Sequence, residues 1–212
     1  MEDVLAVYHR PYDPTQPVVC VDEGGKELHG TPRGTLPLQP GETGRQDYEY
    51  ERHGVCNLFV ALEPLSGARK VRVTERRTNQ DFAEELRLLV DEDYPDVQKL
   101  VLVTDNLNIH RPACLYERFS PTEARRIAAK IEWHYTPEHG SWLNIAECEL
   151  SVLSRQCLAR RIPDKATLIR EVAAWEEERN QAQVTVDWQF TAEQARIKLK
   201  RLYPVLKEQT LT

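Results

Sequence analysis

The 212-residue sequence has no apolar run near the roughly 20 residues that a membrane-spanning helix needs. Its first residues, Met-Glu-Asp-Val, provide neither the basic start nor the apolar segment of a secretion signal. Internal repeats and low-complexity stretches are also missing. We therefore expect a cytoplasmic protein with no membrane partner. The length is sufficient for one domain with a sizeable core.

The five cysteines form no Cys-x-x-Cys pair, and the six histidines do not combine with them at the spacing of zinc ligands. Four of the cysteines lie within or beside apolar patterns, where buried thiols are common. We expect these thiols to pack in the core, and we expect no zinc site.

The sequence also lacks an excess of positive charge, because 28 Lys and Arg residues face 34 Asp and Glu residues, for a net charge of -6. Bulk electrostatics therefore do not hold this chain on DNA. A DNA enzyme is still compatible with this charge, since carboxylates that bind metal ions count as negative. Two local gatherings could contact phosphates or form an ordinary solvated rim. They are Arg69, Lys70, Arg72, Arg76 and Arg77, and then Arg196, Lys198, Lys200 and Arg201.

Apolar segments bounded by turn residues predict strands, and segments of helical periodicity predict helices between and after them. The expected strands are 17–22, 55–63, 69–74, 99–105 and 131–135, with 48–52 as a short addition. The expected helices follow Thr78 and Ser120 as caps and then cover 141–159, 165–181 and 192–202. Residues 24–46 are expected to form a long loop. This order predicts an α/β fold, with a mixed five-stranded sheet flanked by helices.

Three carboxylates stand where charge is costly. Asp22 ends the apolar run Val-Val-Cys-Val, Asp105 ends Leu-Val-Leu-Val-Thr, and Glu147 lies in a helical pattern. If they converge, they repel one another, and divalent metal ions would relieve that repulsion and support displacement at phosphorus. Each aspartate could instead be a turn residue. Glu23, beside Asp22, points to the opposite face of the strand and is the weaker ligand candidate.

The third carboxylate is ambiguous, because Glu149 stands two residues after Glu147. Residues placed at 100° intervals give a broad apolar arc that includes Glu149, while Glu147 falls at its margin beside Asn144. A marginal carboxylate can project toward a solvated pocket, whereas a carboxylate within the arc needs a buried partner or a function. Periodicity alone leaves the choice open.

Several blocks of the sequence resemble the signatures of DDE transposases. They are Val-Asp-Glu at 21–23, Asp-Asn-x-x-x-His from Asp105 to His110, Tyr-Thr-Pro at 135–137, and His-Gly-Ser-Trp-Leu-Asn at 139–144 followed by Glu147. Two later blocks, 155–164 and 195–204, resemble the bacterial branch of the mariner superfamily called insertion sequence six-thirty. The resemblance covers residues 17–204. Residues 1–16 are then expected to be an extended lead-in, and residues 205–212 a tail.

The resemblance implies a ribonuclease-H-like fold and a catalytic triad of Asp22, Asp105 and Glu147. It further implies two Mg²⁺ (or Mn²⁺) ions, double-stranded DNA as substrate, and a dimer that joins two element ends. Glu149 is left with a structural role. Two features depart from the family: 41 residues separate Asp105 from Glu147, and the chain has no helix-turn-helix region before its first catalytic strand.

Other polar residues near these blocks are candidates for orienting the ligands or the DNA: Asn106, Asn108, His110 and Asn144. His110 could equally be a satisfied loop histidine. Trp142 either stacks on a base or packs in the core, and core packing is the more common fate of such a residue. Three activities are compatible with the sequence: DNA cleavage with strand transfer, DNA cleavage alone, and DNA binding or assembly by an inactive remnant.

Overall fold

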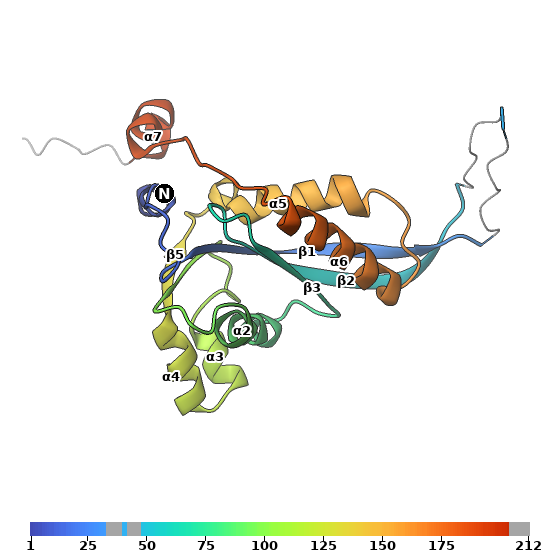
Figure 1. The fold of residues 1–212 in the computed structure, drawn as a ribbon, viewed down its shortest axis with the longest axis horizontal. Helices are drawn as coiled ribbons and strands as arrows, with labels where there is room; N and C mark the ends of the chain where they lie inside the picture. Colours follow the sequence, from blue (N-terminus) through green and yellow to red (C-terminus); the bar gives the residue numbers. More distant parts are fainter. Residues whose placement is uncertain (33–39, 42–47, 204–212) are drawn as a thin grey trace, which may run out of the picture.

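A five-stranded mixed sheet forms the centre of the protein. The computed structural model describes residues 1–32, 40–41 and 48–203 (Figure 1). The strand order is β3-β2-β1-β4-β5, with β2 antiparallel to both β3 and β1, and β4 parallel to both β1 and β5. The strands are β1 (Val18–Gly30), β2 (Glu51–Leu62), β3 (Arg69–Thr74), β4 (Leu100–Thr104) and β5 (Ile131–Tyr135). The predicted mixed five-stranded sheet is confirmed.

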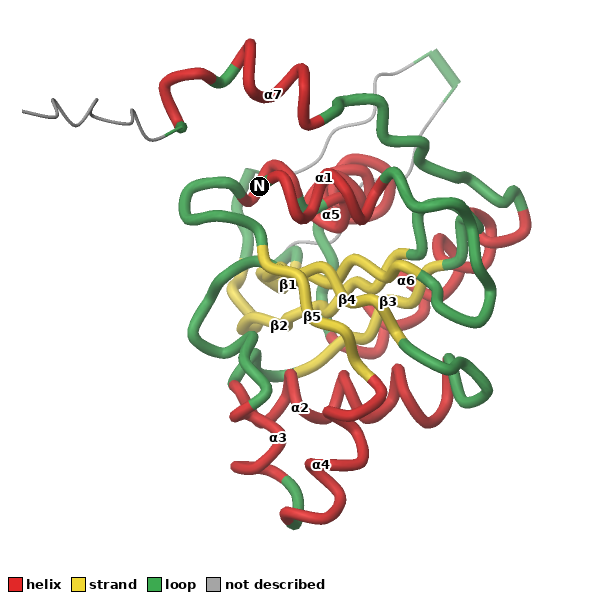
Figure 2. The backbone as a smooth tube through the Cα atoms, turned by 90° about the vertical axis from the view of Figure 1, so that its left-hand side faces the viewer, coloured by secondary structure: helices red, strands yellow, loops and turns green. Residues whose placement is uncertain are grey.

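Helices cover both faces of the sheet. Figure 2 shows α2, α3 and α4 below the strands, α1 and α5 above them, and α7 farther out over α1. The helices are α1 (Glu2–Tyr8), α2 (Asn79–Leu88), α3 (Ala113–Arg118), α4 (Pro121–Lys130), α5 (Ile145–Leu153), α6 (Lys165–Gln181) and α7 (Ala192–Lys198). None of the described helices is long and apolar enough to cross a membrane.

Alternation along β1 divides the core into two faces. Val19 and Val21 pack with α2, α3 and α4, while Cys20 packs on the other face with α1 and α5. On β4 the residues alternate in the same way, since Leu102 joins the first cluster and Val103 the second. A third cluster fills the space between α6 and the β2–β3 hairpin. The face of each strand residue is therefore set by its position in the sequence.

Several helices begin where their capping residues predict. Thr78 and Asp81 form a reciprocal capping box at the start of α2, and Ser120 accepts from the backbone N–H of Glu123 at the start of α4. Asp164 caps α6, which has the predicted bounds. Four of the five cysteines are buried, as expected, and Cys148 is exposed.

The structure corrects four expectations. The predicted extended lead-in contains α1, whose apolar side chains are buried in the second core cluster. β1 continues to Gly30 through the first part of the predicted loop, because it pairs with β2 along this length. The predicted segments at 48–52 and 55–63 are joined into the single strand β2, which begins at Glu51 and ends at Leu62. The predicted helix 141–159 is interrupted at Asn144, between a 3-10 turn (Ser141–Leu143) and α5. The predicted tail, 205–212, lies outside the described residues.

Gly67, in the turn between β2 and β3, allows the C-terminal segment to approach closely. Its φ is +76°, and a Cβ there would lie 2.9 Å from the carbonyl carbon of Gln183. We predict that Gly67→Ala lowers the free energy of unfolding by about 1–3 kcal/mol, because both the backbone conformation and this contact become strained. Urea unfolding measures the effect. Gly25→Ala, where the added Cβ meets only ordinary contacts, is the control and should change stability by less than about 0.5 kcal/mol.

Candidate active site

Asp22, within β1, lies level with Asp105 at the point where the shorter strand β4 ends. In the parallel ladder Val18 pairs with Val101 and Cys20 with Val103. Continuing this register by two residues brings Asp22 beside Asp105, just after β4 ends. Both aspartates alternate with the residues of the first core cluster, so both belong to the face covered by α5.

The carboxyl group of Asp22 is held in an unfavourable environment for charge. It is half-buried, and its Oδ1 accepts a hydrogen bond of 2.9 Å from the backbone N–H of Glu23. Burial raises the pKa of Asp22 to about 7, and the nearby charges of Glu23 and Asp105 act in the same direction. The backbone hydrogen bond and His110 offset only part of this effect. A metal cation beside Asp22 would stabilise the ionised carboxylate and so lower its pKa.

His110 is the cation that compensates Asp105. Its side chain is fully buried, its Nδ1 lies 2.5 Å from Asp105 Oδ1, and its Nε2 lies 2.9 Å from Glu23 Oε2. The second contact is off the hydrogen-bond direction, so it acts mainly as an ion pair. Burial lowers the pKa of His110, but the two carboxylates outweigh it and raise this pKa to about 9. The imidazolium of His110 therefore lies between the carboxylates of Glu23 and Asp105 and contacts both.

The direction of the Glu23 side chain was predicted from the sequence, but its partner was not. Glu23 does lie on the face opposite Asp22, because it meets His110 beside the ring of Phe82, at 4.4 Å between ring centroids. Its role as the second partner of His110 was not predicted. The alternation of β1 gave its direction, but nothing in the sequence identified its partner. Asp105 also accepts a hydrogen bond of 3.2 Å from the backbone of Leu107, as in an Asx turn.

Asn144 anchors the start of α5 to β1. Its Nδ2 donates 2.9 Å to the carbonyl of Val21, and its Oδ1 accepts from the backbone N–H of Ala146 as the helix cap. Farther along, Leu150 packs on Gly24, where an added Cβ would lie 3.2 Å from Cδ2. Glu147 lies between these two contacts in the first turn of α5, and its side chain is exposed. Glu147 is thus carried over the stretch of β1 that contains Asp22.

Glu149 has a different environment from Glu147. It is 3% exposed and accepts from Arg179 Nε at 2.9 Å, while Arg69 Nε lies 2.9 Å away. The carboxylate within the apolar arc therefore has the buried partners that its position requires. This arrangement is a structural ion-pair network between α5, β3 and α6.

A hollow of about 370 Å³ opens beside Asp105. Asn106 and His139 are among its lining residues, together with the segment 136–138. His139 has a φ of +59°, a backbone conformation that few residues other than glycine adopt. Asn108 is exposed in the same loop. The hollow gives a substrate access to Asp105 from solvent.

Trp142 lies at the border of this hollow, next to Ser141 in its wall. It is 41% exposed and its ring centroid lies 6.2 Å from that of Phe190. Core packing, the commoner outcome for such a residue, is therefore wrong for Trp142. Lys198 of α7 lies over the other ring of this pair, 5.7 Å from the centroid of Phe190. Trp142, Phe190 and Lys198 thus form an aromatic and basic cluster that begins one residue after Ser141.

The two basic gatherings have different environments. In the first, Arg69 is buried against Glu149, and Arg72 pairs with Glu85 and Asp93 at 2.6 and 2.5 Å. These two arginines hold β3 to the helices and do not form a phosphate-binding rim. The second gathering lies in α7 and the turn after it, and Lys198, Lys200 and Arg201 are exposed there.

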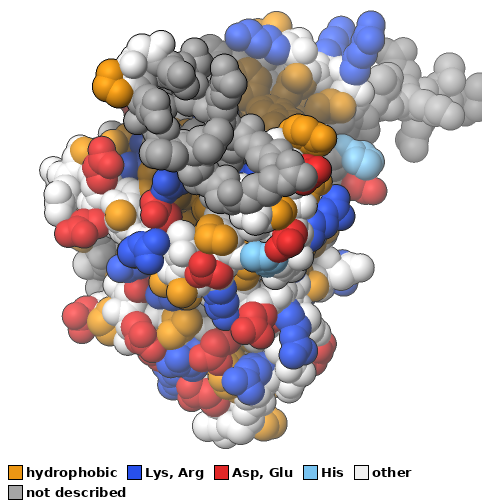
Figure 3. Space-filling view, turned by 90° about the vertical axis from the view of Figure 1, so that its right-hand side faces the viewer, with side chains coloured by type: hydrophobic (Ala, Val, Ile, Leu, Met, Phe, Trp, Pro, Cys, Tyr) orange, Lys and Arg blue, Asp and Glu red, His pale blue; other side chains and the backbone are white. Residues whose placement is uncertain are grey.

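Charge over another face of the molecule is mixed. Figure 3 shows acidic and basic side chains interspersed over its lower part, with no continuous basic surface. This arrangement agrees with the net charge of -6. Any contact with a polyanion must therefore depend on local groups such as those of α7 and not on the field of the whole protein.

The carboxylates around Asp22 and Asp105 are candidate ligands for a metal ion. No group of three His, Cys, Asp or Glu side chains within the described part of the chain already lies close enough together to hold a metal ion. Asp22 and Asp105 nevertheless provide hard oxygen ligands where β4 ends, and Asp22 lacks an ion pair among these residues. The carboxylates of Asp22 and Asp105 are therefore of a donor type that fits Mg²⁺ or Mn²⁺.

The model of one protein family, described as DDE superfamily endonuclease, matches residues 17–169. No protein in the curated set matches the chain. Two solved structures are similar in fold. The Mos1 mariner paired end complex with Mn has a TM-score of 0.54 at 14% identity, over 85% of this chain and 55% of that chain. The Mos1 strand transfer complex has a TM-score of 0.51 at 13% identity, over 88% and 59%.

At such identities the likeness concerns the fold, which is the ribonuclease-H-like fold. The chain spans little more than half the length of these two relatives. The predicted fold class is therefore confirmed.

We predict that Glu149→Gln lowers the free energy of unfolding by about 2–4 kcal/mol, because two arginines lose the charge that compensates them. Glu147→Gln should change it by less than about 0.5 kcal/mol, since this side chain is exposed. Urea unfolding of both variants gives the comparison. Equal effects of the two substitutions would contradict the structural role of Glu149.

The raised pKa of Asp22 has a consequence for stability without metal. The folded protein retains the Asp22 proton up to about pH 7, whereas the unfolded chain releases it near the ordinary value of 3.8. This contribution to stability is therefore complete below about pH 4 and is lost as the pH rises to about 7. We predict that Asp22→Asn, which does not titrate, becomes more stable relative to the original protein by about 1–2 kcal/mol between these pH values. Urea unfolding in EDTA measures this difference, and a pH-independent difference would contradict it.

Proposed function

The chain belongs to the DDE superfamily endonuclease family, and from this premise we propose that it is the catalytic domain of a DNA transposase. The proposed reaction is metal-dependent cleavage of phosphodiester bonds at the ends of an insertion sequence, followed by strand transfer. The observation that carries the proposal is the level position of Asp22 and Asp105 where β4 ends, beneath the helix that presents Glu147.

In this proposal Asp22, Asp105 and Glu147 hold two Mg²⁺ or Mn²⁺ ions. When bound, such ions would activate the attacking hydroxyl and stabilise the charge on the phosphate and the leaving oxygen. The residues around them have distinct tasks. His110 pairs with Asp105 and orients it, Asn144 fixes the start of the helix that carries Glu147, and the hollow beside Asp105 admits the scissile phosphate.

The DNA would lie across the hollow toward α7. Lys198, Lys200 and Arg201 are exposed there and could neutralise phosphates, and Trp142 offers a ring face next to the hollow. The two solved relatives are described as a paired end complex and a strand transfer complex. By analogy we propose double-stranded DNA as the substrate and a dimer as the form that joins two ends.

The sequence blocks around Asp105 and Glu147 favour the insertion sequence six-thirty branch of the mariner superfamily. Such a protein also needs a region that reads the element ends, and in this branch a helix-turn-helix usually serves that purpose. Because the chain spans 55–59% of the two solved relatives, we propose that end recognition is supplied outside these 212 residues.

We predict that the full chain nicks labelled duplex DNA in Mn²⁺ or Mg²⁺, and that Asp22→Asn, Asp105→Asn and Glu147→Gln each reduce this rate at least about 100-fold by removing a metal ligand. Glu178→Gln, an exposed carboxylate on α6, is the matched control and should retain the full rate. Titration with Mn²⁺ should show weaker binding for the three variants and not for the control.

Products separate the related activities. Joining of a cleaved 3′ end to a second duplex supports strand transfer, whereas cleavage without joined products identifies a nuclease. Nicking that persists in Asp105→Asn or Glu147→Gln would overturn the assignment of the triad. Absence of both nicking and Mn²⁺ binding in the original protein would overturn the proposal of an active enzyme.

A further inference from the structure

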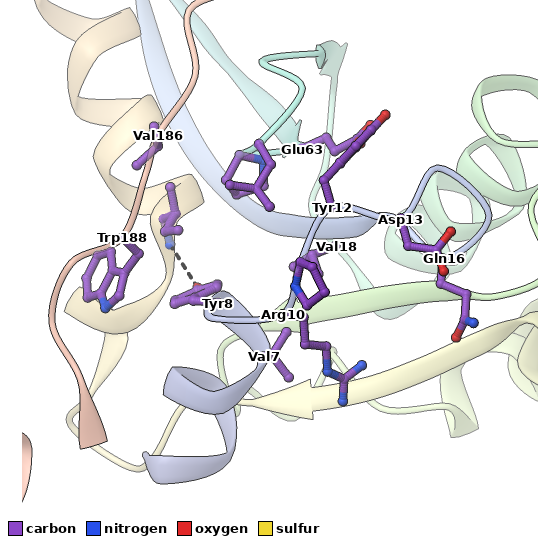
Figure 4. A pocket seen from close by; sticks show the side chains of 14 residues that line it. Val7, Tyr8, Arg10, Tyr12, Asp13, Gln16, Val18, Glu63, Val186 and Trp188 are labelled. Atoms are coloured by element: carbon purple, nitrogen blue, oxygen red, sulfur yellow. Dashed lines mark hydrogen bonds between the residues drawn. The ribbon is translucent and has the colours of Figure 1, made fainter. Parts of the chain in front are cut away.

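The hydroxyl group of Tyr8, the last residue of α1, lies against the start of α5. It donates a hydrogen bond of 2.7 Å to the carbonyl of Leu143 and accepts one of 3.4 Å from the backbone N–H of Ile145. Figure 4 shows the side chain of Tyr8, with the second hydrogen bond as a dashed line. The two partners stand on either side of Asn144, which caps α5. One hydroxyl of α1 thus spans the residue at which the predicted helix is interrupted.

These contacts complete the backbone hydrogen bonding in the first turn of α5. The first N–H groups of a helix have no partner within it. Asn144 accepts two of them, from Ala146 through its side chain at 3.2 Å and from Glu147 through its backbone carbonyl at 3.1 Å. The N–H of Ile145 remains, and the Tyr8 hydroxyl is its acceptor.

Water has no access to replace the Tyr8 hydroxyl at this point. Leu143 is 0% exposed, Ile145 is 1% exposed and Tyr8 is 7% exposed. A buried carbonyl or N–H group without a partner is costly, so the segment that carries it shifts until it finds one. Burial also raises the pKa of Tyr8, so the hydroxyl keeps the proton that it donates to Leu143.

The same hydroxyl is linked to β1. The thiol of Cys20 donates to its oxygen at 3.6 Å, and Cys20 stands two residues before Asp22. Asn144 provides the other link, because it donates to the carbonyl of Val21. Two polar links, one of them through Tyr8, therefore connect the beginning of α5 to the stretch of β1 that ends at Asp22.

The packing of α1 gives the Tyr8 side chain a fixed position of its own. Val4 and Leu5 are buried in the second core cluster. The ring of Tyr8 lies 5.3 Å from the ring of Trp188 between centroids, and Trp188 belongs to the segment before α7 (Figure 4). α1 precedes residues 17–169, which the family model matches, so the hydroxyl comes from outside the matched region.

We propose that Tyr8 is a positioning residue for the metal-dependent reaction, because its hydroxyl fixes the start of α5 and thereby the location of Glu147 relative to Asp22. Glu147 stands in the first turn of α5, two residues after Ile145. A shift of that turn would move its carboxylate away from the ions that the three acids would share, and small displacements of a reacting group are costly to the rate. This role rests on the proposed function and gives α1 a part in the same site.

The test compares Tyr8→Phe, which keeps the ring and removes only the hydroxyl, with the original full chain. We expect deuterium exchange at the amides of Ile145 and Ala146 to become at least about tenfold faster, because the start of α5 is no longer held. Mn²⁺ should bind at least about fivefold more weakly. The kcat for nicking should fall at least about tenfold, with KM for DNA changed less than about twofold.

Two further variants separate positioning from general stability. Tyr94→Phe removes the hydroxyl of a tyrosine on the first core cluster, on the other face of the sheet, and should leave Mn²⁺ affinity and kcat unchanged. Val4→Ala reduces the apolar packing of α1 but keeps the Tyr8 hydroxyl. It should unfold at a lower urea concentration than the original protein and retain its Mn²⁺ affinity and kcat while folded. Equal losses of Mn²⁺ affinity in Val4→Ala and Tyr8→Phe would overturn the positioning role.

Hydrogen exchange in the original protein tests the contact without a variant and without activity. The amide of Ile145, although it is the first of the helix, should exchange at least about 100-fold more slowly than in an unfolded chain. Unprotected exchange at Ile145 would overturn the role of Tyr8. Faster exchange in Tyr8→Phe with unchanged Mn²⁺ affinity and kcat would also overturn it, and would leave the proposed function intact. An original protein that neither nicks DNA nor binds Mn²⁺ would instead overturn the proposed function, and the positioning role with it.

Discussion

The parallel pairing of β1 with β4 is the constraint on which the candidate active site depends. The parallel register sets Cys20 opposite Val103, and its continuation places Asp22, within β1, beside Asp105, which follows the end of β4. The register also sets the face, because side chains alternate along each strand. Asp22 and Asp105 consequently fall on the face covered by α5, and Glu23 falls on the other. A slip of one residue in either strand would separate the two aspartates.

The buried and half-buried acids differ in whether a cationic side chain compensates their charge. Glu149 is enclosed by two arginines, and Asp105 is bridged by His110. These contacts account for the burial of the two acids. Asp22 and Glu63, in contrast, form no ion pair within the described residues, and burial raises the pKa of each. Glu63 follows the end of β2 and meets the hydroxyl of Tyr94, whereas Asp22 lies in β1 beside Asp105. Of the two, only Asp22 adjoins another of the proposed metal ligands, so its uncompensated carboxyl is where the proposed cation would bind.

Local patterns predicted the elements that local chemistry determines. The bounds of α6 were predicted because Asp164 caps the helix and its apolar residues repeat at helical spacing. The mixed sheet and the strands that lead to Asp22 and Asp105 were predicted from apolar runs bounded by polar and turn residues. Other features depend on contacts between distant residues. α1 is stabilised by burial in the core, β1 is extended by its pairing with β2, and the bridge of Glu23 to His110 forms only after two strands meet. No local signal encodes these contacts.

The interruption of the predicted helix at Asn144 explains how α5 acquires a fixed position. An uninterrupted helix from 141 would satisfy its backbone internally, and its first turn would have no directional link to the sheet. Asn144 instead leaves the helical conformation, with ψ at 112°, caps α5 and donates to the carbonyl of Val21. Because Val21 adjoins Asp22, this hydrogen bond ties the helix to the strand at the candidate ligand itself. The loss of one helical turn thereby sets the height of Glu147 above the sheet edge, which helix packing alone would leave free to slide.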